Sequence, residues 1–389
     1  MFDGDVLSTQ NFTFGNRGLL PLVLGLLLSF PADSSAQNTP GPTSPTALSG
    51  YMEVHYTNAE LEDGQLDFHR FILLITHQFS DRIRFVSELE LEHALVAGLE
   101  EAGELELEQA YIDFLLSRSF NVRAGMLLMP VGIINERHEP PVFYGVERPL
   151  VETVIIPTTW FEPGVGIHGE VGRGWRYRAY VTSPLNAARF SAEEGVRDGR
   201  QKGSRTNVGK AAATGRVEYV GIRGLTTGAS FWAGSTGFEF RPRFDVPVRV
   251  VEADARYARA RFEGRAQVAQ VTIAGAGDLN DAIARTTGVN PNIARTLRGS
   301  YLEASYRVVS GARFGDVGTF VRYENVDTQF RMPAGYLPLQ EFDRDAWVVG
   351  ATYWPEPDIA VKFDYVHQRN RSAIVPAPHS FNIGLGWWF

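Results

Sequence analysis

Glu136, His138 and Glu139 fall close together and combine the side-chain types that bind metal ions or exchange protons in catalysis. A working metal site or acid–base site would need a second group of His or Asp residues at ligand spacing. We find no such supporting group in the sequence. We therefore interpret these three residues as loop charges, and the sequence predicts neither catalysis nor a metal site there.

A second stretch, GAGDLNDAIARTTGV (275–289), has the pattern of a short helix within a loop. A nucleotide site would need a glycine-rich fingerprint after a strand and at the start of a helix, which this stretch lacks. The chain also contains no cysteine, which excludes disulfides, thiolate metal ligands and cysteine nucleophiles. The sequence thus favours a protein that is not an enzyme and has no cofactor.

The elements that would position the charged residues are strands. From residue 48 onward, apolar and polar residues alternate in segments of about ten residues, the length of a tilted strand that crosses a bilayer. The sixteen predicted strands are 49–58, 67–79, 82–94, 104–116, 120–129, 164–171, 175–182, 208–220, 225–234, 248–257, 261–273, 299–308, 317–326, 346–354, 359–368 and 379–389.

The connections between these strands alternate between short and long. Residues 80–81, 172–174 and 258–260 are short turns, whereas 130–163 and 274–298 are long loops. Short periplasmic turns opposite long extracellular loops are typical of outer-membrane barrels. We therefore predict an all-β fold, a 16-stranded antiparallel transmembrane β-barrel with both termini on the periplasmic side. A soluble β-sandwich is the alternative, but it does not explain the loop lengths.

The chain ends on the apolar segment SFNIGLGWWF. With a period of two, one face of this strand is apolar: Phe381, Ile383, Leu385, Trp387 and Phe389. An apolar terminus must be held by a core, a partner or lipid. In a barrel, the last strand would pair with the first, and its apolar face would contact outer-membrane lipid.

The N-terminus resembles a secretory signal peptide. The apolar run 19–30 is too short to span a bilayer and is followed by small residues of the kind cleaved by signal peptidase. Asp3 and Asp5 are unusual in such a leader, and a buried core helix is the alternative. We predict a signal peptide at 1–36, a Pro- and Thr-rich segment at 37–47 and the barrel at 48–389. This predicts the outer membrane of a Gram-negative-type bacterium.

The charge balance excludes a nucleic-acid-binding protein. The chain has 37 basic and 45 acidic residues, and its only lysines are Lys202, Lys210 and Lys362. It therefore has no basic patch of the kind that nucleic-acid binding requires. Charged residues make up 21% of the chain, which is too many for a helical membrane bundle.

Alternation along the strands also predicts which charges face the barrel lumen, because successive residues face opposite sides. The predicted pore-lining residues are Arg84, Glu88, Glu90, Glu92, Glu104, Glu106, Glu108, Arg176, Arg178, Arg261, Glu263, Arg265, Arg322, Glu324, Lys362 and Asp364. Carboxylates gather on two neighbouring strands and arginines on the others, which produces a field across the pore. The alternative is that these charges pair with one another and only hydrate the wall.

The connection 130–163 is longer than a simple hairpin loop, and loops of this size are usually functional. Prolines stiffen it and aromatic residues are interleaved with its charges. The charged residues are Glu136, Arg137, His138, Glu139, Glu147, Arg148 and Glu152. We expect this loop to fold into the barrel and narrow it. The alternative is an outer loop that packs on a neighbouring subunit.

Two segments, ELELEQAYIDF (104–114) and residues 121–171, together with the terminal Phe389 resemble the phosphate-selective porin O and P family. The resemblance implies a 16-stranded outer-membrane channel, typically a homotrimer, with the third loop folded into the lumen as a constriction. A terminal aromatic strand also resembles the signal read by the outer-membrane assembly machinery. The family's phosphate-selective members have a lysine-rich lumen, whereas Lys362 is the sole lysine in a predicted strand here.

These observations together predict a porin for passive diffusion of small hydrophilic solutes and ions. The first alternative is a selective anion or phosphate channel, which the family resemblance favours and the shortage of lysine opposes. The second is an outer-membrane barrel that is not a channel, such as an enzyme or an adhesin.

Overall fold

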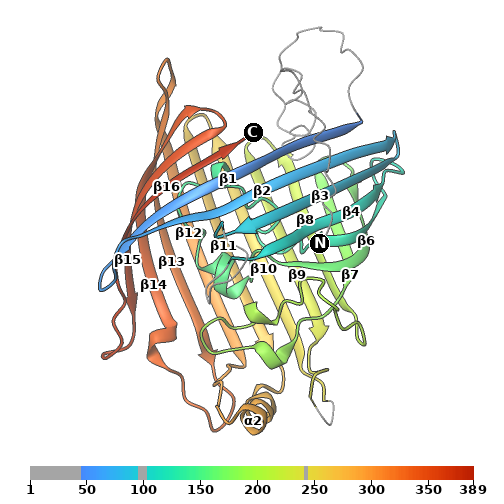
Figure 1. Cartoon of the computed structure of the whole chain (residues 1–389), viewed down its shortest axis with the longest axis vertical. Helices are drawn as coiled ribbons and strands as arrows, with labels where there is room; N and C mark the ends of the chain where they lie inside the picture. The colour runs from blue at the N-terminus through green and yellow to red at the C-terminus, as the bar shows by residue number, and fades with distance from the viewer. Residues whose placement is uncertain (1–44, 95–102, 241–243) are drawn as a thin grey trace, which may run out of the picture.

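The structure is a computed structural model that describes residues 45–94, 103–240 and 244–389 (Figure 1). The predicted signal peptide 1–36 and most of the segment 37–47 lie outside the described residues. Within the described ranges, no helix is long and apolar enough to cross a membrane.

Sixteen strands form a closed antiparallel barrel, in which each strand pairs with its sequence neighbours and β1 pairs with β16. The strands are β1 (Thr46–Ala59), β2 (Gln65–Ser80), β3 (Ile83–Glu92), β4 (Leu105–Phe114), β5 (Asn121–Leu128), β6 (Phe161–Val171), β7 (Trp175–Thr182), β8 (Ala212–Ile222), β9 (Leu225–Ser235), β10 (Pro247–Arg259), β11 (Phe262–Ile273), β12 (Thr296–Ala312), β13 (Gly315–Arg331), β14 (Asp343–Glu356), β15 (Ile359–Asn370) and β16 (Ser380–Trp388). Each corresponds to a predicted strand, so the predicted fold class is confirmed.

Short helical segments lie in the connections: η1 (Pro140–Val142), η2 (Val151–Ile155), η3 (Ala187–Arg189), η4 (Arg197–Gly199), α2 (Ala276–Thr287) and η5 (Gln340–Phe342). The helix predicted within 275–289 is therefore present as α2. In Figure 1, α2 and other long connections lie at the bottom of the barrel, and the C-terminus lies at the top, where the tight turns are. We refer to these two ends as the long-loop end and the short-turn end.

Exposure alternates along the strands, as the sequence pattern predicts. On β10, for example, Val250 and Glu252 are buried whereas Val251 between them is exposed. The buried residues of each strand form the inner face of the barrel, and the exposed apolar residues form the outer face that lipid would cover. Charged residues on the inner face are thereby separated from lipid by the barrel wall.

A β-bulge shifts this alternation in β4. Glu88 pairs with Gln109 and Leu89 pairs with Leu107, so Glu108 is an extra residue on the β4 side. An extra residue changes which side chains face inward beyond it. Asp113 consequently lies on the inner face, fully buried, although the alternation that places Glu108 inside would direct Asp113 outward.

Candidate channel interior

Hydrogen bonds join the two ends of the connection between β5 and β6, and we call this hydrogen-bonded part its base. The Asn135 side chain donates to the carbonyl oxygens of Met129 at 2.7 Å and Trp160 at 2.9 Å, and it accepts from the Trp160 N–H at 2.7 Å. The buried Glu152 carboxylate accepts from the N–H of Ile133 at 2.6 Å. These hydrogen bonds join the two ends of the segment, which we call the third connection (129–160).

From this base, the third connection reaches strands that are far away in the sequence. Lys362 of β15 donates to the Gly145 carbonyl at 2.8 Å, and the Val146 N–H donates to Asp364 at 2.6 Å. Lys362 and Asp364 are both buried on the inner face of β15.

Further contacts hold the segment to β11 and β13. Arg265 donates to the Val142 carbonyl at 2.6 Å, and the Leu150 N–H donates to Glu324. A segment that starts at β5 and bonds to the inner faces of β11, β13 and β15 passes through the interior of the barrel.

The connection between β7 and β8 reinforces this arrangement. Arg197 donates to the Thr153 carbonyl at 3.0 Å, and Arg200 donates to the Thr159 carbonyl at 2.5 Å. Burial lowers the pKa of Arg197 to about 10, so its guanidinium remains charged at neutral pH. Two arginines of the β7–β8 connection thus bind backbone carbonyl groups of the third connection.

Lys202, in the same β7–β8 connection, reaches the wall at β4. Its ammonium lies 2.8 Å from Glu104 and also contacts Glu106. Burial lowers the pKa of Lys202, but hydrogen bonds to Glu104 and Glu106 outweigh burial and raise it. Two of the predicted lumen carboxylates therefore share one lysine that lies in no strand.

His138 of the third connection lies against the other carboxylates of β3 and β4. Its Nε2 is 3.1 Å from Glu108 and 3.5 Å from Glu88, and its Nδ1 is 3.1 Å from the Asn135 carbonyl. Glu88 is 2% exposed and Glu108 is 0% exposed. The sequence interpretation grouped His138 with Glu136 and Glu139, whereas the structure brings it to carboxylates of two strands.

Glu90 is also buried, beside Arg70 of β2, which in turn bonds to Glu53 of β1. The predicted pore-lining carboxylates Glu88, Glu90 and Glu108 therefore lie on the inner face but are covered. They pair with His138 and Arg70. A pore-lining residue, in contrast, would contact water. This difference arises because the third connection fills the space in front of them.

A different set of inner-face arginines is partly exposed, and each of them pairs with a buried carboxylate. Asp113 lies 2.7 Å from both Arg84 and Arg123, and Glu218 lies 3.1 Å from Arg178 and 3.0 Å from Arg256. These arginines come from β3, β5, β7 and β10. They form two clusters, and the carboxylate of the second, Glu218, also lies 3.1 Å from the buried Arg216.

The remaining predicted residues are spread over several environments. Arg178 also contacts Glu136 at 3.2 Å, and Arg176 contacts Glu170 at 2.9 Å. Arg261 is exposed and lies in the turn before β11. Arg322 is buried between Glu303 at 3.3 Å and Glu324 at 2.6 Å, and Arg265 is 3.7 Å from Glu303. Of the loop charges, Arg137, Glu139 and Arg148 are partly buried, and Glu147 is exposed, 2.8 Å from His55.

Sequence reasoning missed several charged groups of the interior: Glu53, Arg70, Asp113, Arg123, Arg216, Glu218, Asp254 and Arg256. Alternation on β8 and β10 could have identified Arg216 and Asp254, because the residues next to each of them in the strand are apolar or small and face the opposite side. Asp113 could have been found only by noticing that the apolar phase of β4 changes near Gln109.

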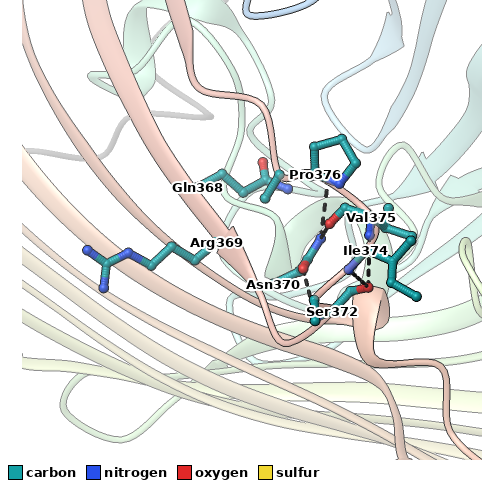
Figure 2. Close-up of a pocket in the computed structure, with 9 residues that line it drawn as sticks. Gln368, Arg369, Asn370, Ser372, Ile374, Val375 and Pro376 are labelled. Carbon is teal, nitrogen blue, oxygen red and sulfur yellow. Dashed lines mark hydrogen bonds between the residues drawn. The ribbon is translucent and has the colours of Figure 1, made fainter.

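A pocket lies between the end of β15 and the last long connection (Figure 2). Asn370 donates to the Val375 carbonyl at 3.1 Å, and Ser372 accepts from the N–H groups of Ile374 and Val375. These bonds shape the loop itself, and we assign the pocket no role in the channel.

Comparison with known proteins gives a match over nearly all of the described chain. The family model for phosphate-selective porin O and P matches residues 49–384. An uncharacterized protein of Aquifex aeolicus is 35% identical over 334 residues, which cover 83% of this chain and 75% of that protein.

Two solved structures show a similar fold. The outer membrane channel DcaP of Acinetobacter baumannii has a TM-score of 0.58 at 11% identity, covering 88% of this chain and 97% of that chain. The trimer form of OmpT, an outer membrane protein of Vibrio cholerae, has a TM-score of 0.55 at 10% identity, covering 88% and 99%.

Proposed function

This chain belongs to the phosphate-selective porin O and P family and is an outer-membrane channel for passive diffusion, and we propose that it passes small hydrophilic solutes and ions with weak charge selectivity. The observation that carries this proposal is the pairing of the partly exposed arginines of the interior. Arg84 and Arg123 share Asp113. Arg178 and Arg256 share Glu218 with Arg216, and they also contact Glu136 and Asp254, respectively. Paired charges of both signs create no deep well for a single ion type.

The test is the reversal potential of single channels in a planar bilayer under a potassium chloride gradient. Weak selectivity predicts a reversal potential far from the limits for ideal cation or anion selectivity. A reversal potential near either limit would contradict the proposal.

A selective phosphate channel is the second candidate, favoured by the family match and by the arginines of the interior. Guanidinium groups bind phosphate in a bidentate way, so arginine could take the role of lysine, which is scarce in this lumen. Phosphate added to chloride solutions distinguishes the two candidates. A phosphate-binding channel would show a saturable block of chloride current, whereas the weakly selective channel would show only the effect of ionic strength.

We also propose that residues 130–163 narrow the channel, because this segment bonds to the inner faces of β11, β13 and β15. The segment would replace part of a wide aqueous lumen with protein. Passage would then be limited to small solutes. Liposome swelling with sugars of increasing size tests this size limit.

Assembly and targeting form a separate set of proposals. The trimer form of OmpT supports a homotrimer, and the apolar outer face would contact lipid. Residues 1–36 would be removed as a signal peptide, which N-terminal sequencing of the outer-membrane protein would reveal as a start at Gln37. The strand that ends in Phe389 would be the segment read by the outer-membrane assembly machinery.

A further inference from the structure

Three of the eight histidines lie side by side at the long-loop end of neighbouring strands. His55 is in β1, His69 is in β2, and His93 follows the last residue of β3. The rings of His55 and His69 stack with centroids 4.6 Å apart, and the rings of His69 and His93 meet edge to face at 5.6 Å. This histidine row plays no part in the interactions that hold the third connection to β11–β15.

Asp67 lies between His69 and His93. Its Oδ2 is 3.1 Å from His69 Nδ1 and 2.9 Å from His93 Nδ1. One ligand atom from each of Asp67, His69 and His93 falls within 4.8 Å of the other two. All three side chains are partly exposed, so an ion from solution can reach them.

The spacing suits a small transition-metal ion. Zinc–nitrogen and zinc–oxygen bonds of about 2.1 Å place neighbouring ligand atoms about 3.0–3.4 Å apart in octahedral or tetrahedral geometry. The two Asp67–histidine distances are close to this value. An ion between the three atoms would take the place of the protons in these hydrogen bonds, and each neutral imidazole would keep its one proton on Nε2.

The backbone holds the ligands in place. The His93 N–H donates to the His69 carbonyl at 3.0 Å, which fixes the two residues relative to each other. His93 has a φ of 53°, in the left-handed region where asparagine, aspartate and histidine are the commonest residues after glycine. This backbone position directs the imidazole toward Asp67, and it would also suit asparagine.

We propose that Asp67, His69 and His93 form a binding site for a divalent transition-metal ion at the long-loop mouth of the channel. Two imidazoles and one carboxylate favour zinc, copper or nickel over calcium and magnesium, which prefer all-oxygen ligands. Solvent would complete the coordination shell. The stacked His55 connects this site to the third connection, because its Nδ1 lies 2.8 Å from Glu147.

Calorimetric titration of the folded, full-length detergent-solubilised protein with zinc chloride tests the site. We expect saturable binding and resistance to competition by excess calcium. His93→Asn retains a residue suited to positive φ while it removes a ligand, and His69→Gln removes the second imidazole. Each should weaken zinc binding by at least about tenfold, because even residues that only support metal ligands contribute that much.

The matched control is the double variant His367→Gln with His379→Gln, which removes the other neighbouring histidine pair at this end, with rings 4.2 Å apart. It should bind zinc like the unmodified protein. Equal zinc binding by folded His93→Asn and His69→Gln would overturn the proposal, as would the absence of saturable zinc binding in the unmodified channel. Equally strong calcium binding would also overturn it. A heat-modifiability gel confirms that each variant is folded.

Channel recordings supply a second readout. Zinc added on the long-loop side should shift the reversal potential toward anions, because the bound ion adds positive charge at the mouth. A chelator should reverse this shift, and His93→Asn should abolish it. An identical zinc effect in His93→Asn channels would show that zinc acts elsewhere and would contradict the assignment.

Discussion

Lys362 on β15 donates a hydrogen bond to the carbonyl oxygen of Gly145 at 2.8 Å, and its ammonium lies 3.7 Å from the centroid of the Phe143 ring. The lysine is 2% exposed. It therefore fastens the third connection to the barrel wall, and it is not available to attract anions in solution. The one lysine that the sequence places in a strand has a structural partner within the protein.

Lys362→Met should loosen the third connection. The change leaves the Gly145 carbonyl without its donor, and a buried polar group without a partner costs about 1–3 kcal/mol. The strand pairing of the barrel does not depend on this contact, so the barrel should still fold. We expect noisier single-channel currents and a higher mean conductance, measured in planar bilayers.

The control for this variant is Lys210→Met. Lys210 pairs with Asp245, and both side chains are about half exposed. Exposed ion pairs contribute little, so this variant should conduct like the unmodified channel. Quiet, unchanged currents from a folded Lys362→Met channel would show that the contact does not restrain the third connection.

The sequence was sufficient to predict the barrel because alternation and loop length are local properties of the chain. Each strand carries its own pattern, and an apolar face opposite a polar face requires lipid or a core on one side only. The limits of prediction are equally physical. The extra residue Glu108 reverses the alternation within β4, and Asp113 was missed for this reason.

The interior could not be predicted in the same way. Alternation shows that Glu88 and Glu108 face inward, but it contains no information about what lies in front of them. His138 reaches both carboxylates from a loop, and Lys202 reaches Glu106 from another. Such contacts depend on how two long connections fold together, for which the sequence has no periodic signal.

Neutralising the partly exposed arginines should change ion selectivity. Arg178 and Arg256 both pair with Glu218, and each side chain is 21% exposed. A charge about 4 Å from a permeating ion contributes about 1 kcal/mol in water and more where the wall lowers the dielectric constant. Arg178→Gln with Arg256→Gln should therefore shift the reversal potential toward cations.

Two comparisons make this experiment specific. Glu88→Gln with Glu90→Gln should shift the reversal potential less, because both carboxylates are buried beside His138 and Arg70. Arg118→Gln changes an exposed arginine in the turn between β4 and β5 and should have little effect. A larger shift from the glutamate pair than from the arginine pair would show that the conducting path runs along β3.

Deletion of Phe389 should reduce the amount of folded barrel in the outer membrane. Its N–H donates to the Gly50 carbonyl at 2.9 Å, its carbonyl accepts from the Gly50 N–H at 3.0 Å, and its ring stacks on Phe71 at 5.9 Å. These contacts lie at the seam between β1 and β16, where the barrel closes. Phe389→Tyr keeps the backbone bonds and an aromatic ring, so it should assemble normally. Normal assembly of the deletion variant would rule out a need for this residue.

Shortening the third connection should raise the single-channel conductance more than any charge change. The base must be preserved, because Asn135 bonds to Met129 and Trp160, and Glu152 accepts from Ile133. Replacing 137–149 with a short Gly- and Ser-rich linker removes the segment that includes Gly145 and Val146, while it leaves both base residues in place. A linker of this composition adopts no fixed structure and leaves more of the lumen to water.

The expected result is a larger conductance and the passage of larger sugars in liposome swelling. The charge variants Arg178→Gln and Arg256→Gln serve as the comparison, because they remove positive charge without replacing the third connection. Removal of 137–149 also removes the partners of Lys362 and Asp364, which would then face water and regain hydration. A shortened channel that folds, as judged by heat modifiability, yet conducts no better than the unmodified protein would show that the narrowest section lies outside the third connection.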